Sequence, residues 1–302
     1  MSLALARGER APASLRRLRT AKAALLTGMG LAPFAGFIFL FLLLPVAKMI
    51  AGAFVLGQGG VGTDNFRRAL SPQYLGAFRT SIGISLETAL LGALVGTVVA
   101  YAIVQGAAQR RRGFVVAFCT VTSNFAGVPL AFAFITTLGA VGWVTLLVER
   151  VFHVNLYTDL GFAIYSYYGL VIVYTYFQLP LMVLLAVPAI NGLRREWREA
   201  AQNLGASSWQ YWRDVGLPVL TPALVGACAL LFANAFGAYA TAYSLSSGAI
   251  NLVPLRIGTL INGDVNFDAG LANALGVGMT VVIAGAILVY QWANRSARRW
   301  MR

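Results

Sequence analysis

Six hydrophobic runs, each long enough to cross a lipid bilayer, restrict the fold of this 302-residue sequence more than any other feature. A membrane-spanning helix needs about 20 predominantly apolar residues. The runs cover residues 25–47, 80–104, 114–138, 162–190, 219–243 and 271–293. They lack the alternating polar and apolar pattern of a membrane β-barrel. We therefore expect an all-α polytopic membrane protein with six transmembrane helices, because helices satisfy their own backbone hydrogen bonds in lipid.

The composition supports the membrane class. Hydrophobic residues make up 59% of the chain, charged residues only 11%, and the mean hydropathy is +0.73. We expect one six-helix transmembrane domain at residues 25–293, flanked by basic tails at 1–24 and 294–302. The start of the chain resembles a signal peptide, but its apolar region is too long and leads into a full span, so we expect a retained first helix.

A polar insert, residues 194–218, separates the fourth run from the fifth and reads RREWREAAQNLGASSWQYWRDVGLP. Its first part is amphipathic and rich in helix-forming residues, and Gly205 is expected to end that helix. A second short helix can begin after the turn with Ser207 or Ser208 as its N-cap. Pro218 is expected to end this second helix before the chain re-enters the membrane.

The insert resembles the EAA loop of bacterial ABC importer permeases. The residues that carry the resemblance are Glu199, Ala200, Ala201, Gly205, Val215, Leu217 and Pro218. Val215 stands where the family pattern has Ile. The stretch from Tyr174 to Pro222 also resembles the core region of this superfamily. An amphipathic hairpin lying on the membrane is the alternative explanation of the insert.

The resemblance implies both partners and a mechanism. The insert would form coupling helices that sit in a cleft of a cytoplasmic ABC ATPase subunit. Two permease subunits would pack side by side, the second commonly a paralogue in this branch. ATP-driven closure of two ATPases would switch the pathway from inward-open to outward-open, and an extracytoplasmic solute-binding protein would deliver the solute. The chain would then be a transport subunit of a bacterial cytoplasmic (inner) membrane and not an enzyme.

The basic residues predict the orientation of the chain in the membrane. Seventeen of the 23 Lys and Arg fall in the N-terminal tail, the second connection, the insert and the C-terminal tail. By the positive-inside rule both termini and the EAA loop are cytoplasmic. The net charge is +13, and the basic residues flank membrane spans. We therefore expect anionic membrane lipid as their counter-charge, and we expect no nucleic acid as a partner.

Five polar residues in the predicted spans are candidates for the translocation path: Glu87, Asn124, Gln178, Asn234 and Tyr239. Glu87 is the only acidic residue within the six runs, so it should face the bundle interior, a partner helix or a water-filled path. It is either a counter-charge for a cationic solute or a carboxyl group bonded to a neighbouring helix. Asn124 lies where Gly127 and Pro129 interrupt the third run, and such a break is tolerated only against protein or water.

Further patterns concern helix packing and the outer loops. Gly92 and Gly96 are spaced for close approach of another helix, and Pro180 and Pro188 should kink the fourth span. In the first outer loop, a short helix capped by Thr63 or Asp64 is expected through Leu70. The loop after the fifth run is expected to hold a re-entrant helix and to contact the binding protein.

Residue patterns for several other functions are missing from the sequence. Neither Lys22 nor Lys48 is preceded by Gly or followed by Ser or Thr, so there is no P-loop and energy must come from another subunit. A single His argues against a His-based metal site or a Ser-His-Asp triad. We expect no catalytic residue, no metal site and no cofactor in this chain.

The substrate is less closely defined. The loop reads EAAQNLGAS, with Asn-Leu where sugar permeases usually carry Ile-Asp, and so resembles the polyamine, opine, phosphonate and ferric-iron branch. A spermidine/putrescine-type permease is the favoured interpretation, and Glu87 is compatible with a cation. A phosphonate or other organic anion, or ferric iron, is the alternative substrate. A stand-alone channel or carrier is the alternative from a different class.

Overall fold

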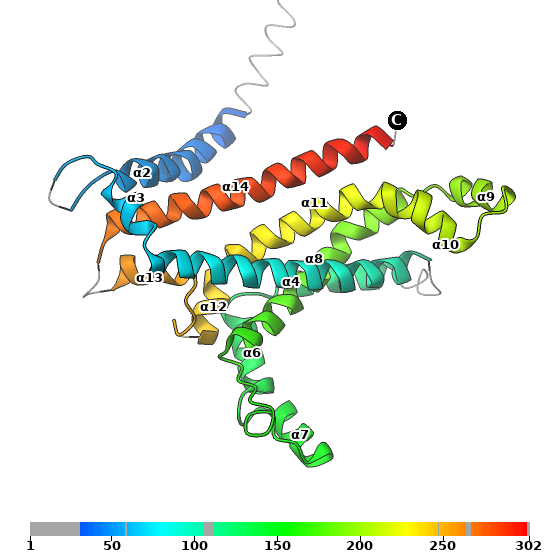
Figure 1. The fold of residues 1–302 in the computed structure, drawn as a ribbon, viewed down its shortest axis with the longest axis horizontal. Helices are drawn as coiled ribbons and strands as arrows, with labels where there is room; N and C mark the ends of the chain where they lie inside the picture. The colour runs from blue at the N-terminus through cyan, green and yellow to red at the C-terminus, as the bar shows by residue number, and fades with distance from the viewer. Residues whose placement is uncertain (1–30, 58, 106–111, 247, 264–266, 301–302) are drawn as a thin grey trace, which may run out of the picture. The chain divides into compact units, whose positions relative to one another are not determined.

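The structure, a computed structural model, describes residues 31–57, 59–105, 112–246, 248–263 and 267–300 (Figure 1). Two compact units divide the chain after Gly52. In the first, the described residues belong to the helical run Leu31–Ala53, which includes a π-helical turn, η1 (Phe39–Leu43), and α2 (Leu44–Ala53). The first predicted span therefore extends to Ala53 and not only to 47. The predicted tail at 1–24 lies outside the described residues.

The second unit, residues 53–302, contains the remaining helices. They are α3 (Asp64–Ala69), α4 (Pro72–Gln105), α5 (Arg112–Ser123), α6 (Val128–Leu138), α7 (Trp143–Phe152), α8 (Tyr167–Asn191), α9 (Arg195–Asn203), α10 (Ser208–Tyr211), η3 (Trp212–Gly216), α11 (Leu217–Phe236), α12 (Tyr239–Ser246), α13 (Val253–Asn262) and α14 (Ala269–Trp300). Over the described ranges, extended pairing is limited to one isolated bridge between Val55 and Val61. Helix α3 confirms the short helix that was expected in the first outer loop.

Six helical runs are long and apolar enough to cross a membrane, which confirms the predicted class. They are Leu31–Ala53, Pro72–Gln105, Val128–Phe152, Tyr167–Asn191, Ser208–Phe236 and Ala269–Ala293. The second predicted span begins earlier than expected, at Pro72, because proline suits the first turn of a helix, where its missing N–H would have had no partner.

The third predicted span, 114–138, is divided in the structure. Helix α5 ends at Ser123, and α6 begins after Gly127, whose φ of +74° lies in the left-handed region that favours glycine. This confirms the predicted interruption. The run Val128–Phe152, made of α6 and α7, has the length of a span, whereas α5 is a shorter apolar helix. Glu149 and Arg150, which follow the predicted third span in the sequence, therefore lie in a helix.

The connection from α7 to α8 contains an ordered polar turn. The backbone N–H of Asn155 and the hydroxyl of Thr158 donate to the Asp159 carboxylate at 2.8 and 3.0 Å. These bonds stabilise the ionised form and hold the pKa of Asp159 below its ordinary value. This turn leads to Ser166, whose side chain accepts from the Gly169 N–H and caps α8.

The fifth predicted span, 219–243, ends earlier than expected. Helix α11 stops at Phe236, and α12 begins at Tyr239 after a short break at Gly237. The hydroxyl of Tyr174 in α8 donates to the Ala238 carbonyl at 2.6 Å, which satisfies a backbone group that the break leaves free. A tertiary contact from another helix therefore stabilises the break.

Helices α4 and α8 form the most extensive helix pair of the unit. A Cβ atom built at Gly92 would lie 3.0 Å from the Gln178 Cβ, and one built at Gly96 would lie 2.6 Å from the Met182 Cβ. The two backbones thus approach closely where α4 has no side chain, as the small-residue spacing predicted.

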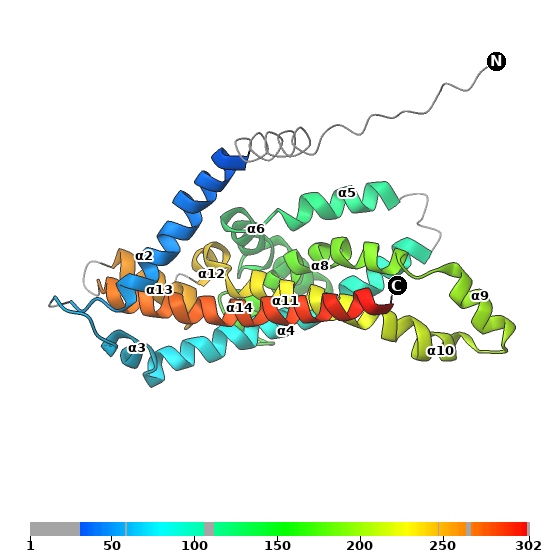
Figure 2. The same cartoon turned by 90° about the horizontal axis from the view of Figure 1, so that it is seen from above.

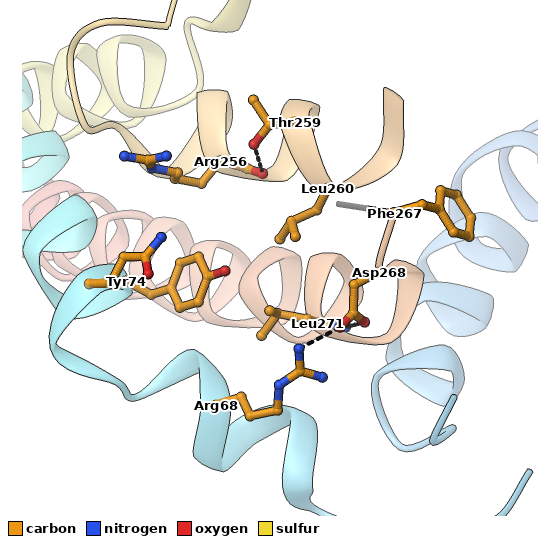
Figure 3. A pocket seen from close by; sticks show the side chains of 9 residues that line it. Arg68, Tyr74, Arg256, Thr259, Leu260, Phe267, Asp268 and Leu271 are labelled. Atoms are coloured by element: carbon orange, nitrogen blue, oxygen red, sulfur yellow. Dashed lines mark hydrogen bonds and ion pairs between the residues drawn. The ribbon is translucent and has the colours of Figure 1, made fainter. Parts of the chain in front are cut away.

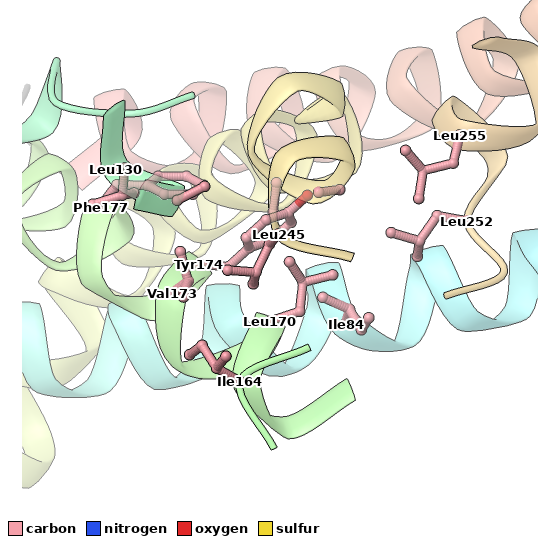
Figure 4. Close-up of a cluster of buried hydrophobic side chains, with 13 residues drawn as sticks. Ile84, Leu130, Ile164, Leu170, Val173, Tyr174, Phe177, Leu245, Leu252 and Leu255 are labelled. Atoms are coloured by element: carbon pink, nitrogen blue, oxygen red, sulfur yellow. The ribbon is translucent and has the colours of Figure 1, made fainter. Parts of the chain in front are cut away.

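Buried apolar side chains gather at successive levels along the unit. One cluster joins α4, α6, α8, α12 and α13 around Tyr174, which is only 2% exposed (Figure 4). A second lies between α4, α5, α8 and α11, and a third between α3, α13 and α14. These clusters hold the helices in place relative to one another, and the polar sites described below lie at the ends of these helices.

The second unit has two distinct ends. Helices α9 and α10 and the C-terminal end of α14 lie toward one end, and α3 and α13 lie toward the other (Figure 2). The predicted tail at 294–302 begins as part of α14 rather than after it. We call the end with α9 and α10 the loop end, and the end with α3 and α13 the α13 end.

Candidate functional site

The insert 194–218 folds as two helices joined by a glycine turn. Helix α9 ends at Asn203, and Gly205 takes φ +80°. The Gly205 N–H donates to the Gln202 carbonyl at 2.9 Å, and the Ala206 N–H donates to the Ala201 carbonyl at 3.0 Å. This pair of bonds is a Schellman motif, which ends helices at a left-handed residue. The predicted break at Gly205 is confirmed.

The second helix of the insert begins at a complete capping box. The Ser207 side chain accepts from the Gln210 N–H, and the Gln210 side chain accepts from the Ser207 N–H at 2.7 Å. Ser207, one of the two predicted N-caps, is therefore the capping residue. Because hydrogen bonds fix both sides of the turn, α9 and α10 form a defined projection rather than a flexible loop.

The predicted end of the second helix at Pro218 is wrong. Helix α10 continues through the π-helical turn η3 into α11, so Ser208–Phe236 is one helical run. The Leu217 N–H bonds to the Trp212 carbonyl across this wider turn. The π turn shifts the hydrogen-bond register just before Pro218, which has no N–H to donate. The insert is therefore joined directly to a membrane span.

Two exposed apolar residues stand on either side of the glycine turn. Leu204 is 88% exposed and Trp209 is 71% exposed, and we call these two residues the loop tip. Large apolar side chains exposed at the end of a projection outside the spans are candidates for contact with another molecule. Sequence reasoning missed both residues, although a Leu and a Trp on either side of a predicted glycine turn were an available signal.

The residues of the EAA pattern occupy different parts of this projection. Glu199 and Ala200 are exposed on α9, and the Glu199 carboxylate pairs with Arg195 at 2.9 Å. Ala201 is half-buried and supplies the carbonyl that closes the glycine turn. Val215 lies in η3, and Leu217 is exposed at the start of α11.

Glu87, on α4, is exposed on the surface of this single chain and accepts a hydrogen bond from the Tyr167 hydroxyl of α8 at 2.8 Å. The bond links Glu87 to a neighbouring helix, as one of the two sequence interpretations expected. Sequence reasoning had not identified Tyr167 as its partner. A hydrogen-bonded carboxyl on an exposed face of a span requires protein or water beside it.

Gln178, on α8, is fully buried and lies between helices. Its amide contacts the Thr88 hydroxyl of α4 at 2.8 Å. With the amide oxygen facing Thr88, the amide nitrogen donates to the Leu231 carbonyl of α11 at 2.9 Å. This orientation satisfies both ends of the amide and links three helices. The assignment of Gln178 to a solute path stays a prediction.

The remaining candidates lie around the break between α5 and α6 and on α11. The exposed Asn124 donates to the Thr120 carbonyl at 2.8 Å, within its own helix end. The Gly127 N–H donates to the Thr241 hydroxyl at 2.9 Å, which places this break against α12. In α12, Tyr239 stacks on Tyr243 with ring centroids 5.5 Å apart. Asn234 is exposed on α11.

A polar pocket of about 380 Å³ lies at the α13 end of the unit, between α3, α4, α13 and α14 (Figure 3). Arg68 donates to the Asp268 carboxylate at 2.6 Å, and Arg256 donates to Asn251 at 2.7 Å. Both arginines thus have partners within the chain. Among the described residues, no group of three or more His, Cys, Asp or Glu side chains could hold a metal ion.

The profile of the family described as "Binding-protein-dependent transport system inner membrane component" matches residues 114–302. The chain belongs to this family. The matched region begins in α5 and contains the whole insert and the two helices that flank it in sequence, α8 and α11. Members of this family are membrane components of transport systems, which agrees with the six spanning helices.

Individual relatives carry different substrate names. The chain is 26% identical to the thiamine transport system permease protein ThiP of Escherichia coli over 71% of this chain and 40% of that protein. It is 24% identical to the probable sulfate permease cysT of Chlorokybus atmophyticus over 70% of this chain and 69% of that protein. It is 31% identical to the spermidine/putrescine permease PotB of Haemophilus influenzae over 41% of this chain and 43% of that protein. The matched part of the chain is less than half the length of ThiP and of PotB.

A solved structure shares the fold. It is a chain of a bacterial ABC transporter involved in the import of the acidic polysaccharide alginate. The TM-score is 0.67 at 19% identity, over 94% of this chain and 99% of that chain. At this identity the likeness concerns the fold of the permease family.

Proposed function

We propose that this chain is the solute-conducting permease subunit of an ATP-driven importer and that the insert 194–218 docks a separate ATPase. The observation that carries the proposal is the loop tip, Leu204 and Trp209, exposed on a projection that continues without a break into α11. A rigid connection of this kind can pass movement of a docked partner into a membrane span. The family membership supports the same function.

The proposed setting is the bacterial inner membrane with the insert and both termini on the cytoplasmic side. Arg194, Arg195, Arg198 and Arg213 in the insert and Arg295 at the end of α14 support this orientation. The other arginines of the N-terminal and C-terminal tails lie outside the described residues or have no described side chains. A second permease subunit, a paralogue of this chain, and an external solute-binding protein complete the proposed assembly.

Aspartate at position 205 is expected to abolish binding of the ATPase, whereas asparagine at the same position preserves most of it. A side chain there meets no atom of the chain within 4 Å, and both residues tolerate the left-handed conformation better than most. The two substitutions have nearly the same shape, so their difference isolates a negative charge at the docking face. The measurement is co-purification of a P-loop ATPase with the tagged chain from native membranes.

Equal recovery of the ATPase with Gly205→Asp, Gly205→Asn and the unaltered chain would contradict a docking role for the turn. Recovery of no ATPase with the unaltered chain, in a preparation that retains other membrane complexes, would favour a stand-alone channel or carrier. A Glu199→Lys variant tests α9, the first helix of the same projection. Normal transport by this variant would also contradict the proposal.

We further propose a cationic solute, with a polyamine favoured. The Glu87 carboxyl is exposed on the chain surface and oriented by Tyr167, so it can face a solute or a partner subunit. The match to a spermidine/putrescine permease supports this substrate class. Matches to sulfate permeases favour the alternative, an anion such as a phosphonate. Ferric iron is the third possibility in the same branch.

Replacing Glu87 by glutamine distinguishes the cation from the anion. Glutamine keeps the hydrogen bond to Tyr167 but removes the negative charge. For a cationic solute beside Glu87, that charge stabilises binding by about 1–3 kcal/mol. We expect spermidine uptake by the complete transporter to fall at least about fivefold, with unchanged amounts of assembled complex. Tyr167→Phe is the matched control, because it removes the hydrogen bond and leaves the charge. Undiminished uptake in Glu87→Gln would contradict a counter-charge role.

A further inference from the structure

A second pocket lies at the base of the insert, at the loop end of the unit. Its volume is about 450 Å³, and its lining comes from the end of α4, the α8–α9 connection, α9 and the start of the α10–α11 run. The lining residues are Val104, Gln105, Leu193, Arg194, Arg195, Arg198, Glu199, Gln202, Tyr211 and Trp212. The apolar helices α4 and α8 end at Gln105 and Asn191, so the pocket lies beside the ends of two predicted spans.

The rim of this pocket carries uncompensated positive charge. Arg195 pairs with Glu199 at 2.9 Å, which neutralises the acidic group of the lining. Neither Arg194 nor Arg198 forms an ion pair with any residue that the structure describes. Arg194 lies over the Trp197 ring at 6.0 Å, which limits the freedom of its guanidinium group. Two arginines therefore face the pocket with their charges available.

The floor of the pocket is apolar and aromatic. Tyr211 is 5% exposed, and Trp212 packs edge-on against Tyr101 with ring centroids 5.2 Å apart. Val104 and Leu193 are partly buried and pack against the buried cluster between α4, α5, α8 and α11. A charged rim above a fixed apolar floor suits an amphiphilic anion, whose polar end contacts arginine and whose apolar end follows the helices.

We propose that this pocket binds a phosphate-bearing anion and that Arg194 and Arg198 hold the phosphate group. The guanidinium fork matches phosphate oxygens in geometry and in charge. Basic pockets between membrane helices bind anionic lipid headgroups at the cytoplasmic surface. The apolar floor and the position beside the ends of two spans favour a phospholipid headgroup over free phosphate as the source. An occupied pocket would tie the docking insert to the membrane surface. This consequence rests on the proposed function above.

The test measures lipid binding by the full-length chain in detergent micelles, with no ATPase present. Native mass spectrometry compares adducts of dioleoyl phosphatidylglycerol with those of dioleoyl phosphatidylcholine, and inorganic phosphate serves as a soluble competitor. Loss of two basic contacts is expected to weaken binding of phosphatidylglycerol about 30-fold in Arg194→Gln/Arg198→Gln. The control Arg213→Gln/Arg295→Gln removes the same net charge outside the pocket and is expected to bind as the unaltered chain does.

The Arg194→Lys/Arg198→Lys variant keeps the charge and is expected to bind with an intermediate affinity, and the unfolding temperature of the glutamine variant is expected to match that of the unaltered chain, which separates loss of binding from misfolding. Competition by inorganic phosphate at the affinity of the lipid would support the pocket and assign it to a soluble anion. Equal binding of the two lipids, or an equal loss in the pocket variant and the control variant, would overturn the proposal. Since binding is measured without the ATPase, failure of the docking proposal would leave this result unchanged.

Discussion

Leucine at position 96 is expected to prevent the second unit from assembling. A Cβ atom at Gly96 would already lie 2.6 Å from the Met182 Cβ, closer than real Cβ atoms approach, and 3.1 Å from the Leu179 carbonyl oxygen, which is a tight contact. Neither neighbouring atom is the flexible end of a side chain, so α4 and α8 must separate. Overpacking a well-packed core costs about 1–3 kcal/mol or more, and here it opens the largest helix pair of the unit.

The measurement is the yield of monodisperse protein in size-exclusion chromatography, together with the unfolding temperature. Gly285→Leu is the matched control, since a Cβ at Gly285 in α14 meets nothing within 4 Å. We expect the control to match the unaltered chain and Gly96→Leu to lose most of the monodisperse fraction. Equal yields from the two variants would show that α4 and α8 do not approach as closely as described.

Glutamate at both positions of the loop tip is expected to weaken ATPase binding at least about 100-fold. An exposed Trp that becomes buried at the centre of a protein interface can contribute about 2 kcal/mol or more to binding. A carboxylate in the same place adds the cost of burying an unpaired charge. Leu204 and Trp209 are 88% and 71% exposed, and both lie beside the glycine turn, at the end of the projection.

The measurement is titration of purified Leu204→Glu/Trp209→Glu with the ATPase that co-purifies with the unaltered chain. A matched control is Val61→Glu/Leu70→Glu, which alters two apolar residues that are 84% and 65% exposed, nearer the α13 end. The control chain is expected to bind the ATPase with unchanged affinity. If the tip variant also binds normally, the insert does not dock through Leu204 and Trp209, and the hairpin on the membrane becomes the better explanation.

The break at the fifth span shows why a hydrophobic run alone does not fix a helix end. The apolar run continues to residue 243, but the chain turns at Gly237 because Tyr174, distant in sequence, satisfies the Ala238 carbonyl. At Pro218 the helix was expected to end but continues. The π turn just before Pro218 lets the helix pass through a residue type that usually ends helices. In both cases a hydrogen bond that the sequence pattern does not display decided the outcome.

The sequence alone determined the all-α class, the number of spans, the glycine turn at Gly205 and the close contact at Gly92 and Gly96. Each of these depends on hydrophobic length, on local backbone preference or on the spacing of small residues, all of which are visible in a short stretch of sequence. Only the tertiary structure placed Tyr167 on Glu87, fixed Gln178 between three helices, exposed Leu204 and Trp209 and enclosed the pocket around Arg194 and Arg198. These depend on which helices pack together, because burial and pairing between distant segments are decided by the whole core.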